Sequence, residues 1–187
     1  MMEPQRAPEW RIERWFNTEK PLALAALRGR VVLAVAFQML CPGCVSHGLP
    51  QAIRARQVFP ECDLAVVGLH TVFEHHEAQG TPAALVAFLH EYRIPFPVGL
   101  DMPDPERGLP QTMRAYGMQG TPTTLLIDRD GRFRLHKFGH LDDMHLGAVI
   151  ATLVAETARA PDFSDPAAQT RCDSDGCRIE TGAIPRG

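Results

Sequence analysis

The sequence lacks any apolar run long enough to form a membrane-spanning helix, and it lacks an excess of basic residues. A span needs about 20 consecutive apolar residues, so we expect no membrane segment. The whole chain has 19 basic and 22 acidic residues, which give a net charge of -3, and it has no polybasic stretch. A basic surface is what attracts nucleic acid or anionic lipid, so we expect the protein to bind neither.

We also expect no signal peptide, because Arg6, Arg11 and Arg14 leave no apolar centre in the first 20 residues. We therefore expect a cytoplasmic location, where disulfides are mostly transient and catalytic. The cysteine count agrees, since five cysteines cannot all be paired within one chain. Internal repeats are lacking too, and 187 residues with 45% hydrophobic content suffice for one domain with its own core.

What the sequence does contain is the motif Cys41-Pro42-Gly43-Cys44, directly after the apolar run 31–37, which reads as a buried strand. Two thiols at this spacing, where a strand gives way to a helix, are typical of a dithiol/disulfide redox site. The N-terminus of a helix stabilises the reactive thiolate, and the tight turn lets a disulfide close and reopen by exchange. The same spacing also occurs in zinc sites, which usually need a second Cys or His pair.

Predicted strands alternate with predicted helices along the chain. The strands are 31–37, 63–69, 96–100, 123–127 and 132–138, with a short strand or turn at 22–27. The helices are 44–58, with a bend expected at Gly48 or Pro50, then 81–93, 111–116 and 142–159. A βαβ start, a hairpin around the turn 128–131 and a final helix indicate a mixed α/β layout. The composition becomes polar from Pro161, so we predict a domain over residues 1–160 and a tail over 161–187.

With its motif at the end of the first long strand, the sequence resembles the thioredoxin superfamily. Within it the sequence resembles the TlpA/ResA branch of thiol–disulfide oxidoreductases, which grades into the redoxin (AhpC/TSA) group. The resemblance covers residues 15–154 and rests on the order and spacing of several pieces besides the cysteines. These are 29–33, Pro50, 66–68, 92–98 before Asp101, 116–117 and 120–128 followed by Gly131. It implies a three-layer α/β fold, a central mixed sheet flanked by helices, with an N-terminal hairpin extension.

The resemblance also implies roles for the site residues. Cys41 would be the exposed, attacking thiol, and Cys44 would resolve the mixed disulfide formed at Cys41. Thr121-Pro122 matches the cis-proline of the family, whose loop faces the dithiol and whose preceding backbone can pair with a substrate chain. No cofactor is implied.

Three positions depart from the family pattern. Leu40 replaces the usual Trp before the first cysteine, and Val35 stands where thioredoxins carry a buried carboxylate. His47 stands where the ResA-like branch has a glutamate, about one helical turn beyond Cys44. An imidazole there could exchange a proton with Cys44 near neutral pH, or it could be a solvated surface histidine.

Other candidate ligands and thiols lie outside the motif. His70 and the segment 74–77 are rich in metal-ligating residue types, although adjacent histidines in a polar loop are more often solvated. Cys172 and Cys177 form a C-x4-C in the tail, which could relay electrons to the main pair, form half of a zinc site, or serve no redox role. We expect Cys62 to pack against the core.

The sequence therefore predicts a thiol–disulfide oxidoreductase that cycles Cys41 and Cys44. Its partners would be a protein or small-molecule disulfide or thiol and an upstream thiol reductant. One alternative is a peroxiredoxin-like peroxidase acting on hydroperoxides. In such enzymes a threonine stands three residues before the reactive cysteine, where this chain has Gln38. A further alternative is a metal-binding protein of the thioredoxin fold.

Overall fold

Six strands form one mixed sheet in the order β1-β4-β3-β2-β5-β6 in the computed structural model, which describes residues 5–156, 172–173 and 176–177. The strands are β1 (Ile12–Phe16), β2 (Val31–Phe37), β3 (Leu64–His70), β4 (Val98–Asp101), β5 (Thr123–Ile127) and β6 (Phe133–Phe138). Strands β2, β3 and β4 run parallel, whereas β1, β5 and β6 each pair antiparallel with their neighbours. The predicted mixed sheet is confirmed.

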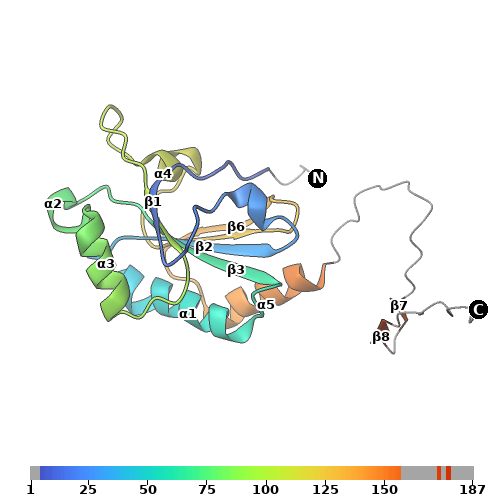
Figure 1. The fold of residues 1–187 in the computed structure, drawn as a ribbon. Coiled ribbons are helices and arrows are strands. Elements are labelled where there is room, and N and C mark those ends of the chain that lie inside the picture. The colour runs from blue at the N-terminus through green and yellow to red at the C-terminus, as the bar shows by residue number, and fades with distance from the viewer. Residues whose placement is uncertain (1–4, 157–171, 174–175, 178–187) are drawn as a thin grey trace, which may run out of the picture.

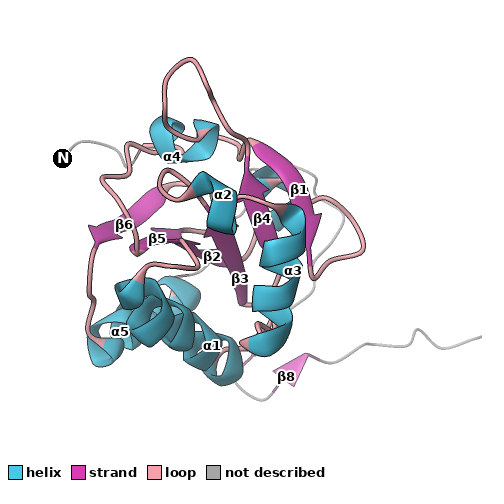
Figure 2. Ribbon diagram, turned by 90° about the vertical axis from the view of Figure 1, so that its left-hand side faces the viewer, coloured by secondary structure: helices cyan, strands magenta, loops and turns pink. Residues whose placement is uncertain are grey.

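Helical elements cover both faces of this sheet, as Figure 1 shows. Helices α1 (Leu49–Val58), α3 (Pro82–Glu91) and α5 (Asp143–Ala155) pack on one face. The other face carries α4 (Gln111–Ala115), the 3-10 turn η1 (Leu24–Leu27) and the N-terminal segment. The connection after β3, predicted as a loop, contains the single turn α2 (His76–Gln79), which is visible in Figure 2. The three-layer arrangement is thus confirmed.

The central strand β2 is buried on both faces and belongs to both cores. Its side chains alternate between the two faces of the sheet. Those facing α1, α3 and α5 are Val31, Leu33, Val35 and Phe37. Those facing the opposite layer are Val32, Ala34 and Ala36. Complete burial of a Val, Leu or Phe side chain contributes about 1.5–3 kcal/mol, so the segment that follows β2 starts from a firmly held strand.

Polar side chains fix several turns where the sequence predicts them. Asp128 Oδ1 accepts hydrogen bonds from the amides of Asp130 (3.0 Å) and Arg132 (2.9 Å), which shapes the β5–β6 hairpin. The hydroxyl of Thr81 accepts from Ala84 N at 3.2 Å and caps α3. Asp142 caps α5 in the same way.

The predicted N-terminal hairpin is wrong. Strand β1 pairs antiparallel with β4, so the N-terminal strand covers one edge of the main sheet. Gly99 permits this pairing, because an added Cβ would lie only 2.9 Å from the Ile12 side chain. The segment 22–27 contains the turn η1 and no strand. Leu24 and Leu27 lie three residues apart, which is one 3-10 turn, so both face the core and are buried.

The tail contributes two short strands to the described residues. β7 (Cys172–Asp173) and β8 (Gly176–Cys177) pair antiparallel, with Cys172 opposite Cys177 in the backbone register. The predicted domain boundary at residue 160 and the predicted end of the last helix, 157–159, lie outside the described residues. Within the described part of the chain, none of the helices combines the length and apolarity that crossing a bilayer requires.

Candidate active site

The turn that carries Cys41 and Cys44 begins directly after the C-terminal end of β2. Cys41 N donates to the carbonyl oxygen of Gln38 at 3.3 Å, and the chain then enters a helix. Cys44 N donates to Cys41 Sγ at 3.3 Å, so a backbone donor points at the first sulfur. Both residues are free thiols, but Cys41 is partly exposed whereas Cys44 is 0% exposed. A partner disulfide can therefore reach Cys41 and not Cys44.

Burial determines the proton affinity of Cys44. Burial, followed by the hydrogen bond with Cys41, raises the pKa of Cys44 to about 12. Hydrogen bonds from the backbone of Gln38 and from Thr121 oppose the shift only in part. Cys44 is therefore a neutral thiol at neutral pH and must lose its proton before it can act as a nucleophile.

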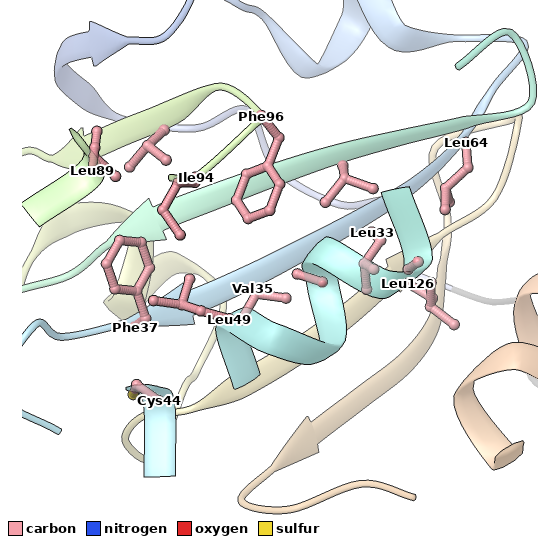
Figure 3. Close-up of a cluster of buried hydrophobic side chains, with 14 of the residues drawn as sticks. Leu33, Val35, Phe37, Cys44, Leu49, Leu64, Leu89, Ile94, Phe96 and Leu126 are labelled. Carbon is pink, nitrogen blue, oxygen red and sulfur yellow. The ribbon is translucent and has the colours of Figure 1, made fainter. Parts of the chain in front are cut away.

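The surroundings of Cys44 are apolar. Figure 3 shows Cys44 at one end of the buried cluster that includes Val35, Phe37 and Leu49. Val35 is 1% exposed and offers no carboxylate to accept a proton from the thiol. Leu40, at the position of the usual Trp, is 57% exposed and lies beside the site.

The loop before β5 closes the site from the opposite side. The Thr121–Pro122 bond is cis, as the resemblance predicted. The Cys41 thiol lies 3.5 Å from the carbonyl oxygen of Thr121 and donates to it. Pro122 packs against two glycines of the active-site helix. An added Cβ would lie 3.3 Å from Pro122 Cδ at Gly43 and 3.0 Å from Pro122 Cβ at Gly48. These glycines therefore let the helix approach the proline loop closely.

The first turn of the active-site helix is a π turn, η2 (Cys44–Gly48), from which α1 continues. The irregularity lies where the sequence predicts a bend. Pro50 has no N–H to donate to the carbonyl of Ser46, and Ser46 Oγ itself donates to the carbonyl of Pro42 at 2.7 Å. Both effects disturb the regular α-helical ladder. Single π turns of this kind occur frequently at functional sites.

His47 lies on the outer side of this π turn and is exposed. Its Nδ1 is 2.7 Å from Ser46 Oγ, and its ring stands edge-on to His140 with centroids 5.0 Å apart. The tautomer of His47 decides which atom donates in the contact with Ser46. A π turn holds more residues than an α turn, which rotates His47 away from Cys44. The role predicted for His47 in proton exchange stays a prediction.

A cavity of about 330 Å³ opens next to Cys41. One wall comes from the segment after β3, the other from the loop before Pro122, and the remainder from the motif itself. Its lining residues are Gln38, Leu40, Cys41, Pro42, Phe73, Glu74, His75, Gln79, Gln119, Gly120, Thr121 and Phe138. Sequence patterns do not identify Phe73, Gln79 and Phe138 as site residues, because only the tertiary structure brings these distant segments to the motif. The residues next to them in the sequence show no hydrophobic periodicity that would indicate contact with Cys41.

The amide of Gln38, the residue at the peroxiredoxin threonine position, faces the segment after β3. Its Oε1 accepts hydrogen bonds from Phe73 N, Glu74 N and Gln79 Nε2, at 3.1, 3.2 and 3.1 Å. Gln38 is 3% exposed. Its oxygen is therefore engaged by protein donors.

The histidines considered as metal ligands are dispersed. His70 is 0% exposed and packs against Phe37, with ring centroids 5.2 Å apart, whereas His75 and His76 are exposed. Burial lowers the pKa of His70 to about 4. Within the described residues, no group of three or more His, Cys, Asp or Glu side chains is placed to hold a metal ion.

The remaining cysteines lie apart from the dithiol turn in sequence. Cys62 is exposed, so the prediction that it packs against the core is wrong. It lies in a tight turn in which Asp63 N and Leu64 N both donate to the carbonyl of Pro60, and such turns run over the surface. The accessory redox role of Cys172 and Cys177 stays a prediction.

Similar proteins of known structure share this fold. A crystallised thioredoxin-like superfamily protein is 58% identical, with a TM-score of 0.79, over 82% of this chain and 98% of that one. A thiol-disulfide isomerase from Corynebacterium glutamicum is 44% identical, with a TM-score of 0.76, over 81% of this chain and 98% of that one. The chain therefore belongs to the thioredoxin-like superfamily.

Curated relatives are more distant in sequence. Protein DipZ of Mycobacterium bovis is 27% identical over 87% of this chain, which spans only 22% of that protein. The thiol:disulfide interchange protein DsbE of Allochromatium vinosum is 26% identical over 80% of this chain and 74% of that protein. No family model matches the sequence.

Proposed function

We propose that this protein is a thiol–disulfide oxidoreductase that cycles Cys41 and Cys44 between a dithiol and a disulfide. The observation that carries the proposal is the contrast between the two sulfurs. Cys41 is partly exposed beside a cavity and faces the Thr121 carbonyl, whereas Cys44 is buried one turn further along the chain. Such a pair supports attack by one thiol and intramolecular release by the other.

The proposed cycle transfers two electrons in two exchange steps. The Cys41 thiolate attacks one sulfur of a partner disulfide, a new S–S bond forms, and the first partner thiolate leaves. Cys44 then loses its proton and attacks Cys41 Sγ, so that an internal disulfide forms and the second partner thiolate leaves. The partner is thereby reduced and the protein oxidised. An upstream thiol reductant restores the dithiol by the reverse steps.

Removal of the Cys44 proton is the step for which the site needs help. The pKa of Cys44 is raised by its burial, and Val35 cannot accept the proton. We propose that the proton leaves by way of the partner thiolate or water, with His47 as the nearest titratable residue along the helix beyond Cys44. His47 is exposed and hydrogen-bonded to Ser46.

Protein disulfides are the proposed substrates, and hydroperoxides are the alternative. The engaged oxygen of Gln38 gives no support to peroxide binding at that position. Two assays on the same preparation separate the alternatives: reduction of insulin disulfides with an external dithiol, and consumption of hydrogen peroxide. We expect insulin reduction that depends on both Cys41 and Cys44. Peroxide consumption without insulin reduction would contradict the proposal.

The tail and the location are further parts of the proposal. We propose that Cys172 and Cys177, which are opposite one another in the β7–β8 register, exchange electrons with the main pair. A chain truncated after Arg159 should then turn over more slowly with an external reductant, and unchanged turnover would remove the tail from the cycle. The proposed cytoplasmic location is tested by cell fractionation.

A further inference from the structure

Two buried glutamine side chains, Gln38 and Gln79, are among the residues that line the cavity beside Cys41, and they have no part in the sulfur chemistry. Gln38 is 3% exposed and Gln79 is 1% exposed. We call them the glutamine pair. A buried amide side chain needs partners for its polar atoms, and the partners here join two segments that are distant in sequence.

Gln38 supplies the acceptor of the pair. Its Oε1 accepts from Phe73 N, from Glu74 N and from Gln79 Nε2. The segment after β3 is thereby held at its backbone by the residue that stands three positions before Cys41. Each such buried hydrogen bond stabilises the folded chain, and a buried donor left without its partner destabilises it by more than the bond itself contributes.

Gln79 joins the two segments through both the nitrogen and the oxygen of its side-chain amide. Its Nε2 also donates to the carbonyl of Glu74 at 2.8 Å, and its Oε1 accepts from Leu40 N at 3.0 Å. Leu40 immediately precedes Cys41. The pair therefore fixes the backbone next to the reactive cysteine relative to the backbone at residues 73–74.

Both of these segments line the cavity, which makes the pair the support of one of its walls. Leu40, Cys41 and residues 73–75 all line the cavity, and we call the part lined by residues 73–75 the 73–75 wall. The contacts of Cys41 Sγ come from other groups, namely Thr121 O and Cys44 N. Loss of the pair should therefore move the wall without removing the contacts of the sulfur.

The cavity continues into an apolar surface that suits a polypeptide. Leu40 is 57% exposed and Phe138 is 45% exposed, and both border the cavity. A polypeptide around a disulfide would contact this surface and the 73–75 wall together. A small disulfide reagent needs only to meet the sulfur of Cys41.

We propose that the glutamine pair consists of positioning residues that hold the 73–75 wall and thereby set the affinity of the site for polypeptide disulfides. The inference rests on the proposed dithiol exchange at Cys41. It predicts a rise in KM for a protein disulfide, with kcat and the reaction with a small disulfide nearly unchanged.

The test uses Gln79→Glu and Gln79→Ala in the full chain. Gln79→Glu replaces one NH2 by an oxygen, which then faces Gln38 Oε1 and the Glu74 carbonyl, whereas Gln79→Ala removes the whole amide. The matched control is Gln51→Ala. Gln51 is also buried, at 7% exposure, and donates to Leu141 O and Asp143 Oδ1 away from the cavity.

The measurements are KM and kcat for insulin reduction and the rate constant with 5,5′-dithiobis(2-nitrobenzoic acid). We expect KM for insulin to rise about tenfold in both Gln79 variants, the loss that one or two buried hydrogen bonds would produce. We expect kcat and the small-disulfide rate to change less than about twofold, and Gln51→Ala to match the wild type. An unchanged KM, or an equal loss with both substrates, would overturn the inference.

Two further results keep the test decisive. If neither Gln79 variant folds by circular dichroism, Phe73→Ala removes a wall side chain while leaving the pair in place. It must then raise KM for insulin alone, and an unchanged KM overturns the inference. A wild-type protein that reduces neither substrate would instead contradict the proposed function itself.

Discussion

Two cysteines and two histidines lie at or beyond the C-terminal ends of β2 and β3, and of each residue type one lies on the solvent side and one on the core side. On the solvent side Cys41 is partly exposed and His47 is exposed, whereas on the core side Cys44 and His70 are 0% exposed. Burial is the main cause that moves the pKa of Cys44 up to about 12 and that of His70 down to about 4. Because the interior disfavours charge of either sign, both core groups are neutral at neutral pH. The same residue types thus have different chemistry on the two sides.

Exchanging each cysteine for serine tests this comparison with the largest expected effect. Cys41→Ser should reduce insulin reduction to the uncatalysed background, because the accessible nucleophile is gone. Cys44→Ser should still react once and then accumulate a mixed disulfide at Cys41, because release needs the buried thiol. Turnover assays with mass spectrometry under non-reducing conditions distinguish the two. Activity retained by Cys41→Ser would reverse the assignment.

Acid should destabilise the protein through His70. The folded state resists protonation of this buried histidine, whose pKa is lowered to about 4, while the unfolded chain binds a proton below pH 6.5. Stability is therefore lost as the pH falls from about 6.5 to 4, by about 3 kcal/mol for the whole shift. Urea unfolding at several pH values measures it.

The comparison variants for this experiment are His70→Leu and His76→Ala. His70→Leu should have a flatter pH dependence than the wild type, because it removes the group that titrates only after unfolding. His76 is exposed, so His76→Ala should keep the wild-type slope. Equal slopes in the wild type and His70→Leu would show that burial of His70 does not govern acid stability.

Release of the mixed disulfide by Cys44 should accelerate with pH. Only the thiolate attacks, and below a raised pKa the thiolate fraction grows about tenfold per pH unit. The raised pKa of Cys44, about 12 in the dithiol form, predicts no plateau between pH 7 and 9. Stopped-flow release from a Cys41–thionitrobenzoate adduct records this rate. A plateau near neutral pH would mean that a base on the protein takes the proton.

Gly48→Ala tests the close approach between the active-site helix and Pro122. An added Cβ would lie 3.0 Å from Pro122 Cβ, so the proline loop must shift, and overpacking of this kind costs about 1 kcal/mol or more. Gly147→Ala in α5 is the matched control, because its added Cβ meets nothing within 4 Å. It should stabilise the helix by up to about 1 kcal/mol. Equal stability changes in urea would contradict the packing.

His47→Ala should have the smallest effect. If His47 assists removal of the Cys44 proton, release should slow less than about fivefold near pH 7 and remain unchanged at pH 9, where hydroxide and water suffice. His140→Ala, which removes the ring that stands edge-on to His47, controls for a change in packing alone. A release profile identical to the wild type at every pH would leave His47 as a surface residue.

The hydrophobic pattern of the sequence and its resemblance to the family predicted most of the sheet and the helices. They also predicted that the loop with Thr121 and Pro122 lies against Cys41. What they missed depends on contacts across the chain. Pairing of β1 with β4 is set by an edge that forms some 85 residues later. Nor could the sequence place His47, because it cannot distinguish an α turn from the π turn that rotates this residue outward.

Gln79 illustrates the same limit at the site. It lies in a polar segment without periodicity, yet it is almost completely buried and reaches the amide of Leu40, 39 positions earlier. Hydrogen bonds of this range leave no signal in neighbouring residues. By contrast, the irregular part of the helix ends at Gly48, directly before Pro50 and at one of the two positions where the sequence predicts a bend, since the backbone effects of glycine and proline are local.

Competitive alkylation of the reduced protein tests the central claim most directly. Iodoacetamide at limiting concentration is applied near neutral pH, and peptide-level mass spectrometry separates Cys41 and Cys44 from the exposed Cys62. The account predicts that Cys41 is labelled well before Cys44, and that Cys44 becomes reactive only after unfolding or at strongly alkaline pH. Labelling of Cys44 before Cys41 in the folded protein would contradict the assignment of the two sulfurs.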